Sequence, residues 1–174
     1  MELRVSSMSD DQTPPRSSGI EQVPRILVVD DEREIRDLLK RHLSYEGFEV
    51  ETVAGGHEAL DALRKHPARV LVTDITMPQM NGLELIDRVK DAFPHIRIVV
   101  MTGRTNEDTI TSCMRSGAGA CVLKPLVDMK AFVRTVRHSV AMYDHWEAVL
   151  ATVRDRARSI GKPPISRPLA KRAS

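Results

Sequence analysis

Side chains that could do chemistry follow four short apolar runs of this chain, directly after each run ends. A pair of carboxylates follows the first run, a single carboxylate the second, a hydroxyl the third and an ammonium group the fourth. Carboxylates held close together repel one another and favour a bound divalent cation, and oxygen-only ligands suit Mg²⁺. The residues concerned are Asp30, Asp31, Asp74, Thr102 and Lys124.

Each of these groups alone has an ordinary structural interpretation. Asp30 and Asp31 could begin a helix, Thr102 could cap one, and Lys124 could be a solvated charge. Together they fit phosphoryl transfer, because the carboxylate of Asp74 is a competent nucleophile for phosphorus. The ammonium group of Lys124 and the hydroxyl of Thr102 would then contact phosphoryl oxygens. Positioning and charge neutralisation are most of what this reaction requires of a protein.

A framework that makes the ends of the apolar runs meet is needed to position these groups. From Arg25 onward, short apolar runs alternate with amphipathic stretches of helical spacing. This alternation predicts an α/β fold: a doubly wound five-stranded parallel sheet, flavodoxin-like with strand order 2-1-3-4-5, and helices on both faces. All strands of such a sheet end at one edge, where ligands bind. The expected strands are 26–29, 48–52, 70–72, 96–101 and 121–123. All are expected to be buried except 48–52, whose alternation is that of a strand nearer an edge.

Four strings of this sequence resemble the receiver domain of bacterial two-component response regulators, as in chemotaxis receivers. They are ILVVDDE, LVTDITMPQMNG, VVMTG and GACVLKP, and the resemblance runs from about Arg25 to about Val140. It implies that a histidine kinase phosphorylates Asp74, that Thr102 is the hydroxyl that follows the phosphate, and that Lys124 is the family's active-site lysine. The metal ligands that it implies for Mg²⁺ are Asp30, Asp31, Asp74 and the backbone carbonyl of Thr76.

Further positions fit or depart from this resemblance. The Lys124–Pro125 bond would match the family's cis peptide, and Gly82 fits the turn after the Met-Pro pair. Cys121 stands where the family commonly has Tyr or Phe, and Leu126 where it often has Phe. The aromatic residue that reports phosphorylation is therefore missing, so the route by which the signal leaves the domain stays open.

Thr76 and Arg104 occupy positions that resemble those tuning the lifetime of the phosphate. Phosphorylation itself should survive all of these departures, since no active-site group is lost.

Composition divides the chain into three parts. Residues 1–24 are rich in Ser, Asp, Gln and Pro and are expected to be a disordered tail. Residues 25–143 are the expected receiver domain, and 144–174 a C-terminal helical extension with a basic tail. Residues 127–160 contain neither Gly nor Pro, and an apolar stripe continues along them at heptad-like spacing. Two interpretations stay open: an extended helix that dimerises or docks a partner, or a helical hairpin folded back on the receiver.

Charge and targeting signals narrow the function classes. The net charge of +2 is too small to indicate a polyanion partner for the whole chain. From Ala151 onward there are seven basic residues and one acid, and a solubilising tail is favoured over an anion-binding adaptor. We expect a cytoplasmic protein with no membrane partner, because no signal peptide and no apolar span is evident. The two cysteines show neither metal-motif spacing nor a disulfide framework, which fits a reducing compartment. A nucleic-acid partner is not expected.

The function expected from these features is a phosphorylation-dependent response regulator. Its partners would be a histidine kinase or phosphotransfer protein and a downstream protein, with a homodimer through the C-terminal helix as a further expectation. It would not be an enzyme beyond catalysing its own phosphorylation and dephosphorylation. One alternative is a receiver-like scaffold that is not phosphorylated. Another is a phosphohydrolase with an aspartyl-phosphate intermediate, although Thr76 stands where such sites usually carry a second acid.

Overall fold

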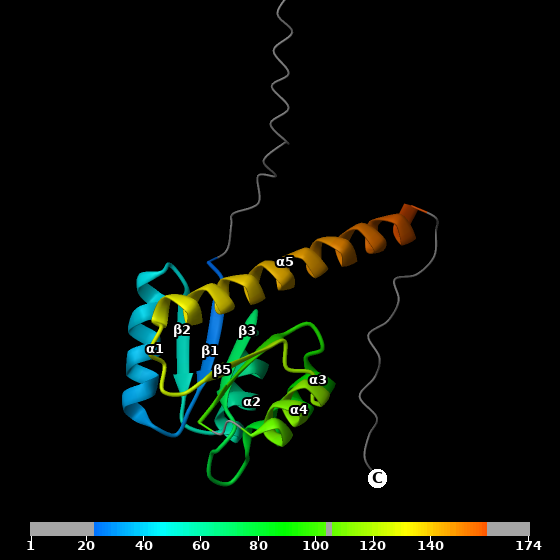
Figure 1. Cartoon of the computed structure of the whole chain (residues 1–174). Helices are drawn as coiled ribbons and strands as arrows, with labels where there is room; N and C mark the ends of the chain where they lie inside the picture. Colours follow the sequence, from blue (N-terminus) through cyan, green and yellow to red (C-terminus); the bar gives the residue numbers. More distant parts are fainter. Residues whose placement is uncertain (1–22, 104–105, 160–174) are drawn as a thin grey trace, which may run out of the picture.

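The computed structural model describes residues 23–103 and 106–159. In this part of the chain, strands and helices alternate, and all strand pairs are parallel (Figure 1). The strand order β2-β1-β3-β4-β5 confirms the predicted doubly wound sheet. The strands are β1 (Arg25–Val29), β2 (Glu49–Val53), β3 (Val70–Asp74), β4 (Arg97–Thr102) and β5 (Ala120–Leu123). The helices are α1 (Arg33–Tyr45), α2 (Gly56–Lys65), α3 (Gly82–Ala92), α4 (Glu107–Arg115) and α5 (Met129–Ser159).

The three central strands are apolar on both faces because helices cover both sides of the sheet. Successive residues of β1 point into different cores: Leu27 and Val29 pack with α2 and α3, whereas Ile26 and Val28 pack with α1 and α5. The same period-two alternation holds along β3 and β4. Packing in these two cores fixes how far each strand extends relative to its neighbours, and therefore where the residues at the strand ends lie.

The fifth strand differs from the expectation of a buried strand. β5 lies at an edge of the sheet, where Cys121 is exposed and Leu123 is 49% exposed. An apolar run of this length has the same appearance whether the strand is central or at an edge, so the pattern could not tell the two apart.

The C-terminal segment forms one continuous helix of 31 residues, α5. Its first half packs on the sheet through Phe132, Val136 and Val140, and its second half projects beyond the sheet (Figure 1). The extended helix is thus confirmed, and the alternative of a hairpin folded back on the receiver is wrong over the described residues.

Three sequence expectations fall on residues outside the described ranges. These are residues 1–22 of the tail expected to be disordered over 1–24, the position of Arg104, and residues 160–174 of the basic segment that begins at Ala151. Within the ranges that the structure describes, no helix combines the length and apolar character that crossing a bilayer requires.

Candidate functional site

The carboxyl ends of the parallel strands bring the chemistry-bearing residues to one rim of the sheet. Asp74 and Thr102 are the last residues of β3 and β4, while Asp30 directly follows β1 and Lys124 directly follows β5. Lys124 joins two of these strand ends, because its Nζ lies 2.8 Å from a carboxylate oxygen of Asp30 and 2.8 Å from one of Asp74. Residues as much as 94 positions apart in sequence thus meet in one cluster.

Three carboxylates at this rim lie close enough together to share one cation. Ligand oxygens of Asp30, Asp31 and Asp74 all lie within 4.8 Å of one another. Asp30 and Asp74 are buried, whereas Asp31 is exposed to solvent. Since ionised carboxylates at this separation repel, the cluster favours a positive charge among them. A set of oxygen ligands with one side open to water suits a hard divalent cation.

Lys124 supplies a positive charge at this cluster. Besides Asp30 and Asp74, its Nζ lies 3.4 Å from Oε1 of Glu32. Burial alone lowers the pKa of a lysine, but the hydrogen bonds and charges of Asp30 and Asp74 outweigh burial and raise the pKa of Lys124. Lys124 therefore stays protonated throughout the neutral range.

The buried carboxylate of Asp30 is unfavourably desolvated. Burial raises its pKa, even though Lys124 and the backbone N–H of Glu32, which donates to Oδ1 at 2.9 Å, both stabilise the ionised form. Lys124 thus offsets only part of the unfavourable free energy of burying this carboxylate. The remaining imbalance is one that a bound cation would relieve.

Asp74 is held in a defined orientation by contacts to both of its carboxylate oxygens. The backbone N–H groups of Ile75 and Thr76 donate to Oδ1 at 2.6 and 3.3 Å, and Lys124 contacts Oδ2. The hydroxyl of Thr73 donates to the backbone carbonyl of Asp74 at 2.9 Å. The backbone of Thr76 therefore lies beside this carboxylate, although the metal contact expected of its carbonyl stays a prediction.

Thr102 lies on the strand next to Asp74, and its side chain is buried. Its backbone carbonyl accepts a hydrogen bond from the N–H of Lys124 at 2.8 Å, which connects the ends of β4 and β5. The bond between Lys124 and Pro125 is cis, as expected. The hydroxyl-bearing and ammonium-bearing residues thus belong to one connected rim.

Comparison with known proteins assigns the chain to a family. A family model described as the response regulator receiver domain matches residues 26–137. The chain belongs to this receiver domain family. Response regulator MprA from Mycobacterium avium is 34% identical to this receiver over 133 residues, which are 75% of this chain and 58% of that protein. The chain thus spans a little over half the length of this curated relative.

Solved receiver structures agree with this assignment. Chemotaxis protein CheY4 of Vibrio cholerae is 28% identical, with a TM-score of 0.64 over 67% of this chain and 98% of that chain. A CheY-like receiver domain protein from Methanospirillum hungatei JF-1 is also 28% identical, with a TM-score of 0.67 over 71% of this chain and 98% of that chain. The flavodoxin-like fold of this receiver is therefore that of chemotaxis receivers.

Arg36 is a contributor to the site that sequence reasoning missed. From α1, its guanidinium donates to the backbone carbonyls of Asp30 and Asp31 at 2.7 and 2.9 Å. These bonds hold the loop that carries the paired acids against the start of the helix. The signal available in the sequence was only an arginine six residues after Asp30, and many exposed helical arginines share that spacing.

The turn between β3 and α3 depends on a glycine in close contact with the site. Gly82 donates its N–H to the carbonyl of Ile75 at 2.9 Å and is buried. A Cβ added at Gly82 would lie 2.1 Å from the backbone carbonyl oxygen of Asp74. Asn81 caps α3 by accepting a hydrogen bond from the N–H of Glu84 at 2.9 Å. The first turn of α3 is therefore packed directly on the backbone that carries Asp74.

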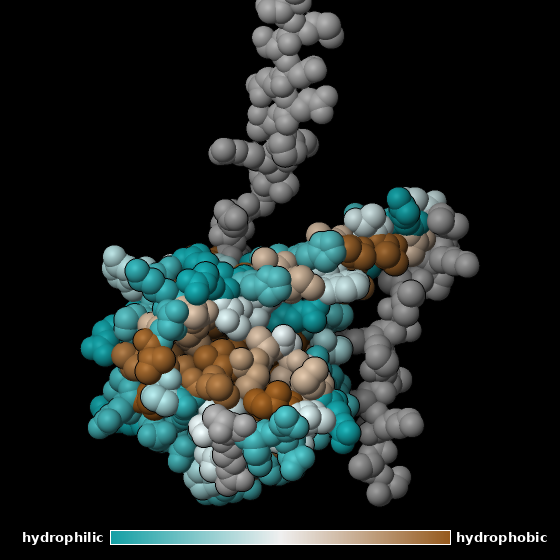
Figure 2. Space-filling model, in the orientation of Figure 1, coloured by the Kyte–Doolittle hydropathy of each residue, from teal (hydrophilic) through white to brown (hydrophobic). Residues whose placement is uncertain are grey.

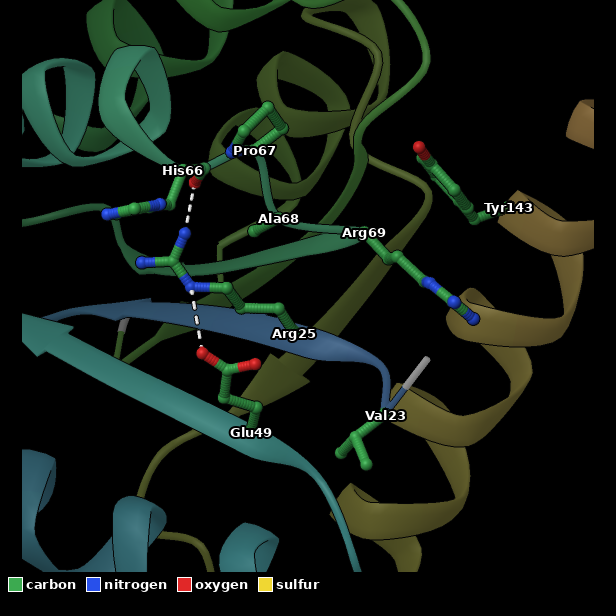
Figure 3. Close-up of a pocket in the computed structure, with 8 residues that line it drawn as sticks. All are labelled: Val23, Arg25, Glu49, His66, Pro67, Ala68, Arg69 and Tyr143. Carbon is green, nitrogen blue, oxygen red and sulfur yellow. Dashed lines mark hydrogen bonds and ion pairs between the residues drawn. The ribbon is translucent and has the colours of Figure 1, made fainter. Parts of the chain in front are cut away.

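A hollow of about 730 Å³ lies at the end of the sheet opposite the acidic cluster, where the strands begin (Figure 3). Both arginines that line it are paired with groups of the described part of this chain. Arg25 donates to the carbonyl of His66 and lies 3.7 Å from Glu49, while Arg69 lies 2.8 Å from Asp144 on α5. The ion pair between Arg69 and Asp144 therefore holds α5 against the starts of the strands. The hollow has no excess of positive charge.

We expect replacement of Lys124 by Met to destabilise the metal-free receiver by about 2 kcal/mol, because it leaves two buried carboxylates without their counter-charge. Urea unfolding in EDTA, followed by far-ultraviolet circular dichroism, measures this. Lys130→Met is the matched control, since Lys130 is an exposed residue of α5. Equal unfolding midpoints for the two variants would show that Lys124 does not neutralise the cluster.

Proposed function

We propose that this protein is a phosphorylation-dependent response regulator that accepts a phosphoryl group on Asp74 from a histidine kinase or phosphotransfer protein. The observation that carries the proposal is the cluster at the rim of the sheet: a buried, oriented carboxylate with two further acids and a lysine in contact or close by. Membership of the receiver family supports the same reading.

The residues present fit Mg²⁺, because the cluster offers carboxylates alone and one of them faces solvent. Asp30, Asp31 and Asp74 would hold the ion, together with the backbone carbonyl of Thr76. When bound, Mg²⁺ neutralises the acids and the charge of the phosphoryl donor.

The chain's own groups have separate roles in the transfer. A carboxylate oxygen of Asp74 forms the new bond to phosphorus, while the P–N bond of a phosphohistidine breaks and the imidazole departs. The N–H groups of Ile75 and Thr76 keep this carboxylate oriented before attack. The ammonium group of Lys124 would pair with a phosphoryl oxygen, and the hydroxyl of Thr102 would donate to another.

Phosphorylation would act as a switch because it changes the partners of Lys124 and Thr102. In the structure described here, Lys124 bridges Asp30 and Asp74. A phosphoryl group on Asp74 would attract this ammonium group more strongly than a single carboxylate does, and β4 and β5 would follow. We propose that a downstream protein reads this change and that the protein works in the cytoplasm, with residues 25–143 as the receiver and 144–174 as an extension. A homodimer through α5 is part of this proposal.

Two alternatives receive less support. A phosphohydrolase would need an activated water on the aspartyl phosphate, and the residue two positions after Asp74 is Thr76, which is not an acid. A scaffold that is never phosphorylated would not need Asp30 and Asp74 buried close together. Like charges placed in this way destabilise a fold unless a cation binds them.

We expect acetyl phosphate in the presence of Mg²⁺ to add one alkali-labile phosphoryl group to the protein, as measured by intact mass. Removal of Mg²⁺ with EDTA should reduce the labelled fraction at least about tenfold, because the carboxylates then repel the anionic donor. Failure of the wild-type protein to gain mass with Mg²⁺ would contradict the proposed function. Equal labelling in EDTA would contradict the role of the metal.

A further inference from the structure

The second half of α5 carries an apolar stripe that the receiver does not cover. The ion pair between Arg69 and Asp144 ties α5 to the edge of the sheet, and beyond this point the helix projects away (Figure 1). Trp146, Val149 and Val153 are 47%, 37% and 46% exposed. Apolar side chains are visible on this projecting end in Figure 2. Exposed apolar residues grouped in this way indicate a surface that another molecule covers.

The stripe is not a simple continuation of the face that packs on the sheet. Two of these residues, Trp146 and Val153, form a seam with Leu150 and Ala157 at spacings of four, three and four, the pattern of a coiled coil, and Val149 flanks this seam. At about 100° per residue, this seam is rotated by roughly 70° from the face that buries Phe132, Val136 and Val140. The projecting half therefore presents its own face, which requires its own partner.

We infer that this face binds the same face of a second copy of the protein, with the two helices antiparallel. The inference rests on the homodimer of the proposed function and adds its orientation and register. In this register Trp146 packs on Ala157 of the second copy, and Leu150 packs on Val153 of the second copy. A large residue thus meets a small one at both ends of the seam, and residues of similar size meet at its centre.

Charge complementarity selects the antiparallel orientation. Glu147 and Arg154 flank the seam on the same side, and within one helix they already lie 3.9 Å apart. Antiparallel helices place residues of the same flank opposite each other, so Glu147 faces Arg154 of the second copy and Arg154 faces Glu147. Two reciprocal ion pairs result.

A parallel pair would lose this complementarity. In a parallel pair, the flank that carries Arg154 faces the flank of the second copy that carries Val149, so Arg154 meets Val149 rather than an acid. A parallel pair therefore forms neither of the two interhelical ion pairs.

The test uses the full chain and two variants with opposite changes, Glu147→Arg and Arg154→Glu. In the antiparallel dimer each variant alone faces like charges, so self-association should weaken about tenfold relative to wild type. An equimolar mixture should regain wild-type affinity, because the heterodimer contains two attractive pairs. Sedimentation velocity measures the affinities. Native mass spectrometry with one variant isotopically labelled identifies the heterodimer.

Each result bears on a separate claim. Variants that associate as tightly as wild type, or a mixture no tighter than its components, would overturn the antiparallel orientation. A wild-type protein that stays monomeric at about 100 μM would overturn self-association altogether and leave a helix of another protein as the occupant. Labelling of the same samples by acetyl phosphate tests Asp74 independently and should be equal in all of them. Circular dichroism verifies that the variants keep their helix.

Discussion

Replacing Asp74 by Asn should abolish phosphoryl uptake from acetyl phosphate and Mg²⁺. The amide is uncharged and a far weaker nucleophile than the carboxylate, whereas its size lets the hydrogen bonds from Ile75 and Thr76 persist at the remaining carbonyl oxygen. Intact-mass measurement should therefore show no phosphorylated species at the time when the wild-type protein is largely labelled. The variant should still fold, because the substitution removes one of several repelling acids.

Asp87→Asn is the matched control for this experiment. Asp87 is an exposed residue on α3, outside the acidic cluster. It should be labelled as fast as the wild-type protein. If Asp74→Asn gained the same mass as Asp87→Asn, then another residue would be the acceptor and the proposed chemistry would be wrong.

Substitution of Gly82 by Ala should cost about 4 kcal/mol or more of folding stability and should also impair phosphorylation. The added methyl group would stand 2.1 Å from the backbone carbonyl oxygen of Asp74 and 2.8 Å from Cα of Ile75. Backbone atoms cannot rotate away as the end of a side chain can, so α3 must shift away from the end of β3. Urea unfolding followed by far-ultraviolet circular dichroism measures the loss. Fluorescence is less suitable, because the single tryptophan lies on the projecting part of α5.

Gly55→Ala controls for the general effect of changing a glycine. A Cβ at Gly55 meets nothing within 4 Å, and Gly55 is the N-cap residue of α2. Gly82 is the first residue of α3, so both substitutions lie at the start of a helix. Its stability should stay within about 1 kcal/mol of wild type. A Gly82→Ala protein as stable as Gly55→Ala would show that the contact between α3 and the Asp74 backbone is not close.

The fold was predictable because its signals are local. Apolar runs such as Ile26–Val29 alternate with helical spacing, and parallel strands separated by helices leave few possible topologies. The same geometry explains why Asp30, Asp74 and Lys124 could be placed at one rim before any coordinates were known. Residues directly after buried parallel strands have little choice of location.

The features that escaped prediction depend on neighbours that periodicity does not report. Burial of β5 was overestimated because its run, Cys121–Leu123, does not tell which strands flank it. The absence of Gly and Pro from 127 to 160 was compatible with one helix or with two, and only the coordinates show that α5 runs unbroken from Met129 to Ser159. The bonds from Arg36 to the acidic loop are likewise long side-chain contacts that no spacing rule specifies.

Chemical mapping of the phosphorylated residue tests the central claim most directly. Borohydride reduces an aspartyl phosphate to homoserine, and peptide mass spectrometry then locates the reduced residue in the chain. The proposed chemistry predicts homoserine at position 74 after treatment with acetyl phosphate and Mg²⁺. Homoserine at position 30 or 31, with Asp74 unchanged in a protein that has gained a phosphoryl group, would contradict it.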